Sequence, residues 1–175
     1  MKKVAVILVA ALTGFLLVSC KESEFSADNP KVPKSDNFVP LNRKIEVLQS
    51  QTLYVPVYSS IPHYMDSLTH LSAILSIRNV SPNDEIIISK VDYFDTNGKF
   101  LKSFIDKPFS LGKLSSKDFL IPVMDLSGGT GANFIVTWES EKKVVAPIIE
   151  TIHIGKLGTQ GFSFTSQAKE IQPEQ

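Results

Sequence analysis

The chain has 175 residues and balances 18 lysines and arginines against 18 aspartates and glutamates, so its formal net charge is zero. That balance offers no clustered basic surface of the kind that nucleic-acid-binding proteins use. Because the chain has one cysteine, it cannot form an internal disulfide. The burial of apolar side chains must therefore hold its fold together.

The N-terminal segment, residues 1–19, has the pattern of a secretory signal peptide. Two lysines precede an apolar run over residues 4–18, which is shorter than the about 20 residues that a transmembrane helix needs. The run ends at Cys20, and the whole segment resembles a bacterial lipoprotein signal. The resemblance implies cleavage before Cys20, lipidation of its thiol and acylation of the new amine. An ordinary cleaved signal would instead leave an unpaired thiol in an oxidising compartment.

We therefore expect a lipid-anchored protein in the bacterial cell envelope, with the membrane as its first partner. Removing residues 1–19 takes away two lysines, which leaves 16 basic against 18 acidic residues and a net charge of −2. Lys21 follows the cysteine, in the place where an aspartate favours inner-membrane retention in enteric bacteria. This resembles outer-membrane sorting, with the protein on the periplasmic side or at the cell surface.

The mature chain is predicted to have three parts. Residues 20–50 hold the lipidated cysteine and a flexible tether, since prolines and alternating charges replace any long apolar period. Residues 51–166 are predicted to form a single folded domain, and residues 167–175 a polar tail.

The folded region has the alternation and composition of β-strands. In residues 71–78, Leu75 and Ile77 fall on one face and Ser76 on the other, which is the period of a half-buried strand. Val136 and Trp138 share a face in the same way and are predicted to lie in the core. Other segments rich in β-branched and aromatic residues are 53–58, 85–95, 119–124, 133–139, 148–154 and 161–164.

Residues 95–98, Asp-Thr-Asn-Gly, predict a hairpin, because glycine adopts the positive φ that such a turn needs. A three-residue loop would place Phe94 opposite Phe100 and Asp92 opposite Lys102. With this hairpin, seven to eight short, mostly antiparallel strands are expected. They predict an all-β fold, a single immunoglobulin-like β-sandwich.

Six motifs occur in order along the folded region. They are Tyr54-Val-Pro-Val-Tyr-Ser59, Leu75-Ser-Ile-Arg-Asn79, Val91-Asp-Tyr-Phe-Asp95, Asp106-Lys-Pro108, Ser127-Gly-Gly-Thr-Gly-Ala-Asn-Phe134 and Thr159-Gln-Gly161. Over about residues 52–166 the chain resembles the bacterial family called domain of unknown function 3124. The resemblance implies a small extracytoplasmic domain, often carried by lipoproteins, and it implies no reaction, ligand or catalytic residue.

The glycine-rich stretch at residues 127–133 has two interpretations. Its backbone N–H groups could cradle an anion or a glycan. Alternatively, it is a tight loop before the strand at 133–139, which is what glycine clusters more often mark, and we favour this interpretation. A binding site here would use Ser127, Gly128, Gly129, Thr130, Gly131 and Asn133.

A metal-binding alternative depends on His63, Met65 and His70. Imidazole and thioether ligands together suit copper(I), so a copper-handling lipoprotein is the alternative to a plain binding module. Otherwise no cofactor is expected. Three nearby tyrosines predict either an aromatic ligand platform or the closed edge of the sandwich, and they are Tyr54, Tyr58 and Tyr64.

Catalytic motifs are missing from the sequence. No Gly-x-Ser-x-Gly elbow or Walker-type phosphate loop occurs. The ingredients of a hydrolytic triad are present, but a triad is defined by its geometry. The sequence therefore favours a non-enzymatic module of unknown molecular activity that binds an envelope protein or a glycan, and no nucleic acid.

Overall fold

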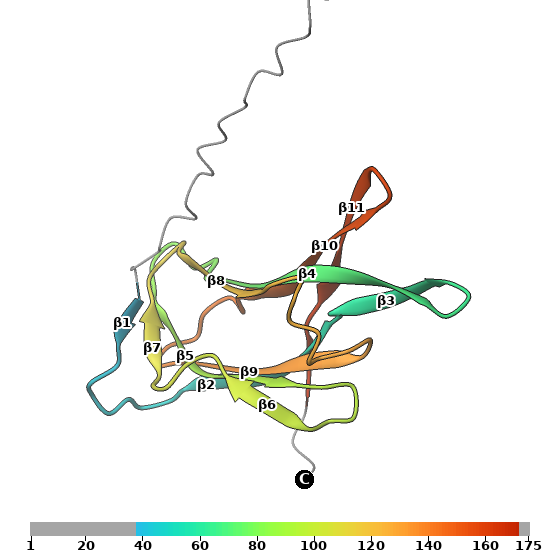
Figure 1. Ribbon diagram of the computed structural model, residues 1–175. Coiled ribbons are helices and arrows are strands. Elements are labelled where there is room, and N and C mark those ends of the chain that lie inside the picture. The colour runs from blue at the N-terminus through green and yellow to red at the C-terminus, as the bar shows by residue number, and fades with distance from the viewer. Residues whose placement is uncertain (1–37, 172–175) are drawn as a thin grey trace, which may run out of the picture. The chain divides into compact units, whose positions relative to one another are not determined.

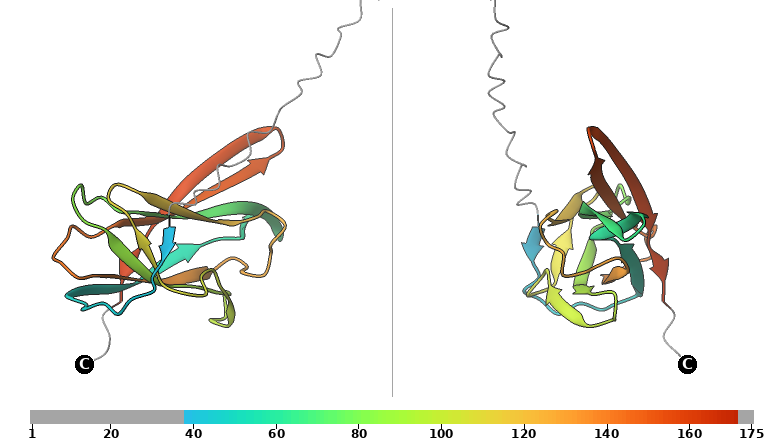
Figure 2. Two further views of the ribbon diagram at one scale, coloured as in Figure 1. Left: turned by 90° about the vertical axis from the view of Figure 1, so that its left-hand side faces the viewer. Right: turned by 45° about the vertical axis from the view of Figure 1, so that its right-hand side comes forward.

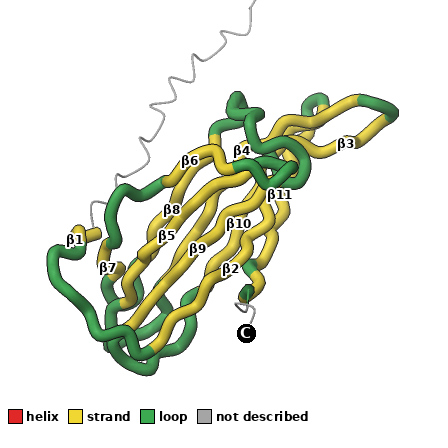
Figure 3. The backbone as a smooth tube through the Cα atoms, turned by 90° about the horizontal axis from the view of Figure 1, so that it is seen from below, coloured by secondary structure: helices red, strands yellow, loops and turns green. Residues whose placement is uncertain are grey.

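The computed structural model describes residues 38–171, which form two antiparallel β-sheets packed face to face (Figure 1). Figure 3 shows strands joined by turns and loops throughout this part of the chain. No helix among these residues is long and apolar enough to cross a membrane. The predicted all-β sandwich is confirmed. The predicted signal, Cys20, most of the tether and the last four residues of the tail lie outside the described residues.

The first sheet has seven strands. From one side to the other they are β1 (Phe38–Pro40), β7 (Phe109–Leu111), β5 (Ile86–Phe94), β9 (Ala132–Ser140), β2 (Gln49–Val57) and β12 (Lys169–Glu170), while β6 (Phe100–Ser103) pairs with the far end of β5. Three long strands, β5, β9 and β2, form its centre.

The second sheet has five strands. In order they are β11 (Gln160–Gln167), β10 (Ile148–Leu157), β4 (Ser67–Arg78) and β3 (Ser60–Tyr64), while β8 (Ser116–Ile121) pairs with the other end of β4. The β10–β11 and β3–β4 hairpins project beyond the two-layer body (Figures 1 and 2).

Residues 38–171 contain twelve strands where seven to eight were expected, and the additional ones are short. β1 falls in the range predicted as tether and pairs with β7. β12 falls in the range predicted as tail and pairs with β2. β3 and β7 were also not predicted. Segments of two to five residues carry too little alternation to be recognised, and they become strands because a neighbouring sheet edge offers hydrogen-bond partners.

The predicted core residues lie together. Leu75 and Ile77 on β4 face Val136 and Trp138 on β9 across the sandwich, and all four are fully buried in one cluster. The Trp138 Nε1–H donates a hydrogen bond of 3.1 Å to Gln51 Oε1. The indole is therefore buried with its polar atom satisfied.

The alternation of a half-buried strand places Ser76 on the solvent side, and this expectation is wrong. Its side chain points to the outer face of β4, but the residue is only 2% exposed. Ser76 lies between Glu150 on β10 and Asp118 on β8, and Arg78 Nε donates a hydrogen bond of 3.2 Å to its hydroxyl. A small residue on a central strand is covered by the longer side chains around it.

The predicted hairpin is partly confirmed. Gly98 has a φ of 76°, and Phe94 lies opposite Phe100 with ring centroids 5.7 Å apart. The predicted pairing of Asp92 with Lys102 is wrong, because a bulge beside Phe94 shifts the register. Lys102 Nζ instead lies 3.2 Å from Asp125 Oδ2.

Candidate interaction surface

A groove of about 570 Å³ lies between the two projecting hairpins. β10 and β4 are paired as far as Gly155, which lies opposite Leu71, and beyond that pair the hairpins diverge (Figures 1 and 2). We call this the hairpin groove. It is lined by apolar Leu68, Val123, Ile154 and Leu157 and by polar His63, His70 and Lys156.

The apolar lining of the hairpin groove is exposed and gathered in one place. Each of Leu68, Val123, Ile154 and Leu157 is between 44% and 49% exposed. Single exposed apolar residues are ordinary on a protein surface, but a cluster with a polar rim marks an interaction site. The groove is therefore the strongest candidate for a binding surface within residues 38–171.

Gly155 sets the shape at the root of the groove. A Cβ atom at this position would lie 2.5 Å from Phe162 Cζ and 2.6 Å from Leu71 Cδ2. Such distances are shorter than van der Waals contact, so any larger residue would push the two side chains apart. The absence of a side chain lets β4, β10 and β11 pack closely where the hairpins separate.

Two of the three residues proposed for copper line the hairpin groove. These are His63 and His70, and His63 Nδ1 is 3.1 Å from Thr69 Oγ1, which engages that nitrogen. Met65 does not line the groove. It lies at the end of the hairpin with a φ of 46° and is 82% exposed. Within residues 38–171, no group of three or more His, Cys, Asp or Glu side chains is placed to hold a metal ion.

The third histidine, His153 on β10, is fully buried. Its ring stacks on Phe164 with centroids 4.5 Å apart, and the backbone N–H of Tyr58 donates to its Nε2 at 3.1 Å. Because Nε2 accepts a hydrogen bond, the proton of the neutral ring is on Nδ1, which has no hydrogen-bond partner in the described structure.

The surroundings of His153 favour the neutral ring. Burial lowers the pKa of His153 below its ordinary value of 6.5. A weaker attraction between the ring and the Phe164 backbone, outside hydrogen-bond geometry, opposes part of that shift. Protonation would also place two donors, Nε2–H and the N–H of Tyr58, against each other. His153 is therefore a neutral packing residue.

The three tyrosines near the first strand do not share one environment. Tyr58 packs edge-on against His153, Tyr64 is 65% exposed on β3, and Tyr54 is 37% exposed on β2. Tyr58 thus helps to close the sandwich, as one of the two interpretations predicted.

The glycine-rich loop uses several of its backbone groups to hold other segments. Thr96, in the β5–β6 turn, donates from its backbone N–H and its hydroxyl to the carbonyl of Gly128, and its Oγ1 accepts a hydrogen bond from Gly131 N–H. The N–H of Ser59 donates to the carbonyl of Gly129, whose φ is 78°. These bonds agree with the structural interpretation of residues 127–131, and the anion or glycan cradle stays a prediction.

Gly128 is fixed by a close approach of side chains. A Cβ atom there would lie 1.9 Å from the Tyr93 hydroxyl and 2.8 Å from Ser59 Oγ. These two hydroxyls are 3.0 Å apart. Burial raises the pKa of Tyr93, and the hydrogen bond from Ser59 opposes part of that shift. Tyr93 is therefore a neutral phenol that packs against the loop.

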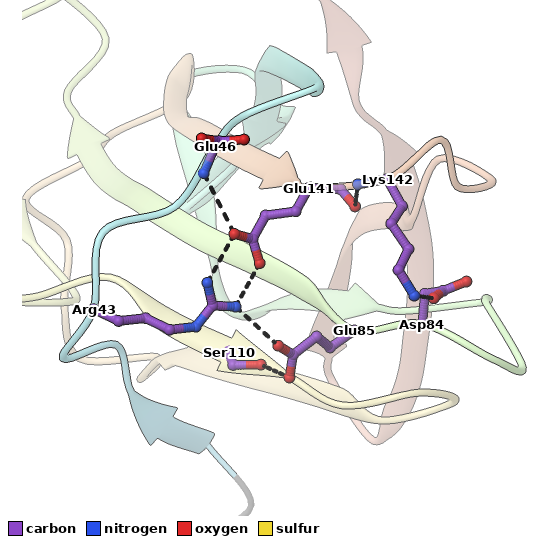
Figure 4. Close-up of polar contacts among 8 residues, drawn as sticks. Arg43, Glu46, Asp84, Glu85, Ser110, Glu141 and Lys142 are labelled. Atoms are coloured by element: carbon purple, nitrogen blue, oxygen red, sulfur yellow. Dashed lines mark hydrogen bonds and ion pairs between the residues drawn. The ribbon is translucent and has the colours of Figure 1, made fainter.

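The opposite end of the sandwich is charged, and Arg43 and Lys142 pair with carboxylates there (Figure 4). Arg43 makes hydrogen bonds of 2.7 Å and 2.5 Å to the two carboxylate oxygens of Glu141, and it lies 3.7 Å from Glu85. Lys142 Nζ is 2.6 Å from Asp84. The Arg43 hydrogen bond lowers the pKa of Glu141. The network clamps the segment before β2 onto the end of β9.

A second groove, of about 640 Å³, lies on the open side of the sandwich between β8 and residues 104–109. Phe109 and Phe119 in its lining belong to the core, and Phe104 packs against them. Because core rings form its apolar wall, we attribute this groove to the gap between the two sheets. The hairpin groove remains the better candidate.

Sequence reasoning missed the apolar residues of the hairpin groove. A signal was present, because residues 148–154 carry isoleucine on both alternating sets, at 148, 152 and 154 as well as at 149. Apolar residues on both alternating sets of a strand predict either that its second face is also buried or that this face forms an interface. That Leu68 and Val123 join Ile154 depends on the tertiary arrangement.

Comparisons with known proteins place the domain in a family. Residues 50–171 match the family model described as "Protein of unknown function (DUF3124)". No curated protein shows significant similarity to the chain. Among solved structures, the crystal structure of Thermotoga maritima 1070 aligns with a TM-score of 0.41 at 11% identity, covering 68% of this chain and 92% of that one.

Proposed function

We propose that this chain, which belongs to the DUF3124 family of proteins of unknown function, is a lipid-anchored binding module of the bacterial cell envelope that performs no catalysis. Its binding surface is the hairpin groove. Its partner is an envelope protein that contributes an apolar segment to this groove.

The observation that carries the proposal is the gathering of Leu68, Val123, Ile154 and Leu157 in one exposed groove. At about 25 cal/mol per Å² of apolar surface, covering such side chains stabilises a complex. The position between two projecting hairpins (Figure 1) suits an elongated apolar segment. The polar rim of His63, His70 and Lys156 supplies donors for orientation.

The anchor is supported by the sequence alone. The basic start, the short apolar run and Cys20 agree with a lipoprotein signal, and several acyl chains together give stable membrane attachment. Lys21 supports the outer membrane as the destination. Protease treatment of intact cells tests the side: degradation places the domain on the surface, whereas full protection places it in the periplasm.

Photo-crosslinking in cells tests the groove. A crosslinking residue in place of Ile154 should give a specific adduct with an envelope protein, and Val123→Asp should abolish it by placing a charge in the apolar lining. The matched control is Val145→Asp, an exposed valine that does not line the groove, and it should leave the adduct unchanged. Equal loss with both variants, or no adduct, would contradict the proposal.

Copper handling is the second candidate, and it is favoured by the shared position of His63 and His70 in the groove. Two imidazoles with an open position would suit copper(I). Titration of the purified protein with copper(I) should then give one bound ion, lost in His63→Ala and retained in His153→Phe. An absence of stoichiometric binding would remove this candidate.

A further inference from the structure

The edge of β11 is open. Within residues 38–171, β11 has β10 as its one neighbour, and it pairs with β10 over all eight residues without a bulge. Its sequence, Gln-Gly-Phe-Ser-Phe-Thr-Ser-Gln, contains no charged residue and no proline. An edge strand of this length and regularity offers a row of backbone N–H and C=O groups to another strand.

The other edges of the two sheets carry protective features that β11 lacks. β8 has Lys117 and Asp118. β3 has Pro62 and an irregular register beside it. In the first sheet, β1 has three residues and ends in a proline, and β12 has two residues, both charged. β6 has four residues and carries Lys102. β2, which β12 covers at two residues, carries Pro56. Charges, prolines, bulges and short length all hinder pairing between edges, so β11 is the edge best suited to receive a strand.

We propose that β11 pairs in antiparallel fashion with β11 of a second copy of this chain, so that two five-stranded sheets become one continuous sheet. The two-fold axis would pass through Ser163. In that register Phe162 lies opposite the second copy's Phe164, and Gly161 lies opposite its Thr165. Residues paired in this way point to the same face of the sheet. The half-buried phenylalanines, which pack over Gly155 and His153 of β10, therefore share one face with those of the second copy, and the exposed hydroxyl residues stay in water.

A second copy fits this edge for two reasons. The strand has no charge, so its own copy brings no like-charge repulsion, and the axis at Ser163 matches aromatic with aromatic, a favourable cross-strand pair. The β10–β11 hairpin also projects beyond the body of the sandwich (Figures 1 and 2), which brings its edge forward. An interface that uses the same surface on both copies closes as a dimer. The inference does not depend on the lipid anchor or on the hairpin groove.

A cysteine crosslink in the full chain tests the register. Residues directly opposite in an antiparallel pair have Cα atoms about 4.5–5.5 Å apart, within the range that a disulfide spans. Ser163→Cys should therefore give a covalent dimer in the membranes of cells treated with an oxidant. In Thr165→Cys, each cysteine would lie opposite Gly161 of the second copy. The second copy's own cysteine would be four residues further along the strand, about 13 Å away, so this matched control should stay monomeric.

The wild-type chain, in which Cys20 is the one cysteine, measures any covalent dimer that forms without a cysteine at position 163, and Ser163→Cys should exceed that yield. Dimers of equal yield from Ser163→Cys and Thr165→Cys would overturn the register, and no dimer from either would overturn the pairing.

Charge variants give an independent measurement without oxidation. Ser163→Lys and Ser163→Asp should each be monomeric by analytical ultracentrifugation in detergent, because the axis places like charges opposite each other. A mixture of the two should recover the dimer mass of the wild type. Ser116→Lys, which changes an exposed serine at the start of β8, should keep that mass. A monomeric wild type, or a Ser163→Lys protein that stays dimeric, would overturn the proposal.

Discussion

Acidification below pH 6.5 is expected to weaken the fold through His153. In the unfolded chain this imidazole binds a proton near its ordinary pKa of 6.5, whereas burial lowers the pKa in the folded protein. Between these two pKa values the unfolded state holds more protons than the folded state, so stability falls as pH falls. The contribution of the neutral ring is fully present above pH 6.5 and is lost progressively below it.

The magnitude follows from the linkage relation. While the folded ring stays neutral, the free energy of unfolding falls with a limiting slope of about 1.4 kcal/mol per pH unit. From pH 6.5 to about 5.5 the loss has an upper limit of about 1 kcal/mol, which applies when the folded ring stays neutral throughout, because the unfolded imidazole is half protonated at the start. Domains are normally stable by about 5–15 kcal/mol. Urea denaturation of the purified protein at a series of pH values would resolve this loss.

His153→Phe tests the assignment. Phenylalanine keeps the aromatic stack with Phe164 but removes the titration and the acceptor for the Tyr58 N–H, so stability at neutral pH should drop by about 1–3 kcal/mol. The slope between pH 6.5 and 5.5 should then become flat. Ser116→Ala, an exposed change that removes no titratable group, is the control and should keep the wild-type slope. If His153→Phe kept that slope as well, the reasoning on burial would be refuted.

Three further outcomes follow from the structure and the sequence. Trp138→Ala should cost about 3–5 kcal/mol of unfolding free energy, as aromatic truncations in cores do. Ser76→Ala should cost about 1 kcal/mol, because it removes a partly buried hydrogen bond. Chemical denaturation would compare the two variants, and equal costs would contradict the core assignment. Gly128→Ala should cost about 1–3 kcal/mol of unfolding free energy through overpacking against the Tyr93 hydroxyl. Gly98→Ala should cost less, because no atom lies within 4 Å of the new methyl group and strain at positive φ is the main cost. A thermal unfolding series that ranked the two variants in reverse would contradict this packing. Cys20→Ser should abolish acylation and signal cleavage, which mass spectrometry of the whole protein would detect, and an acylated Cys20→Ser chain would disprove the anchor.

The sequence predicted the features that depend on local periodicity. Alternation in residues 71–78 and 133–139 identified two central strands and placed Leu75 and Trp138 on the buried side, because successive side chains of a strand point to opposite faces. The six motifs also identified the family. The turn at Gly98 was predicted because few residues other than glycine tolerate its φ.

Only the tertiary structure decided the features that depend on neighbours. Ser76 is buried because adjacent strands carry longer side chains over it, which alternation within one strand cannot reveal. The Asp92–Lys102 pair was missed because one bulge changes every pairing beyond it. The hairpin groove and the open edge of β11 arise because β10 separates from β4 beyond Gly155 while it stays paired with β11. Sequence patterns report which residues can be buried, whereas strand order determines which of them find a partner.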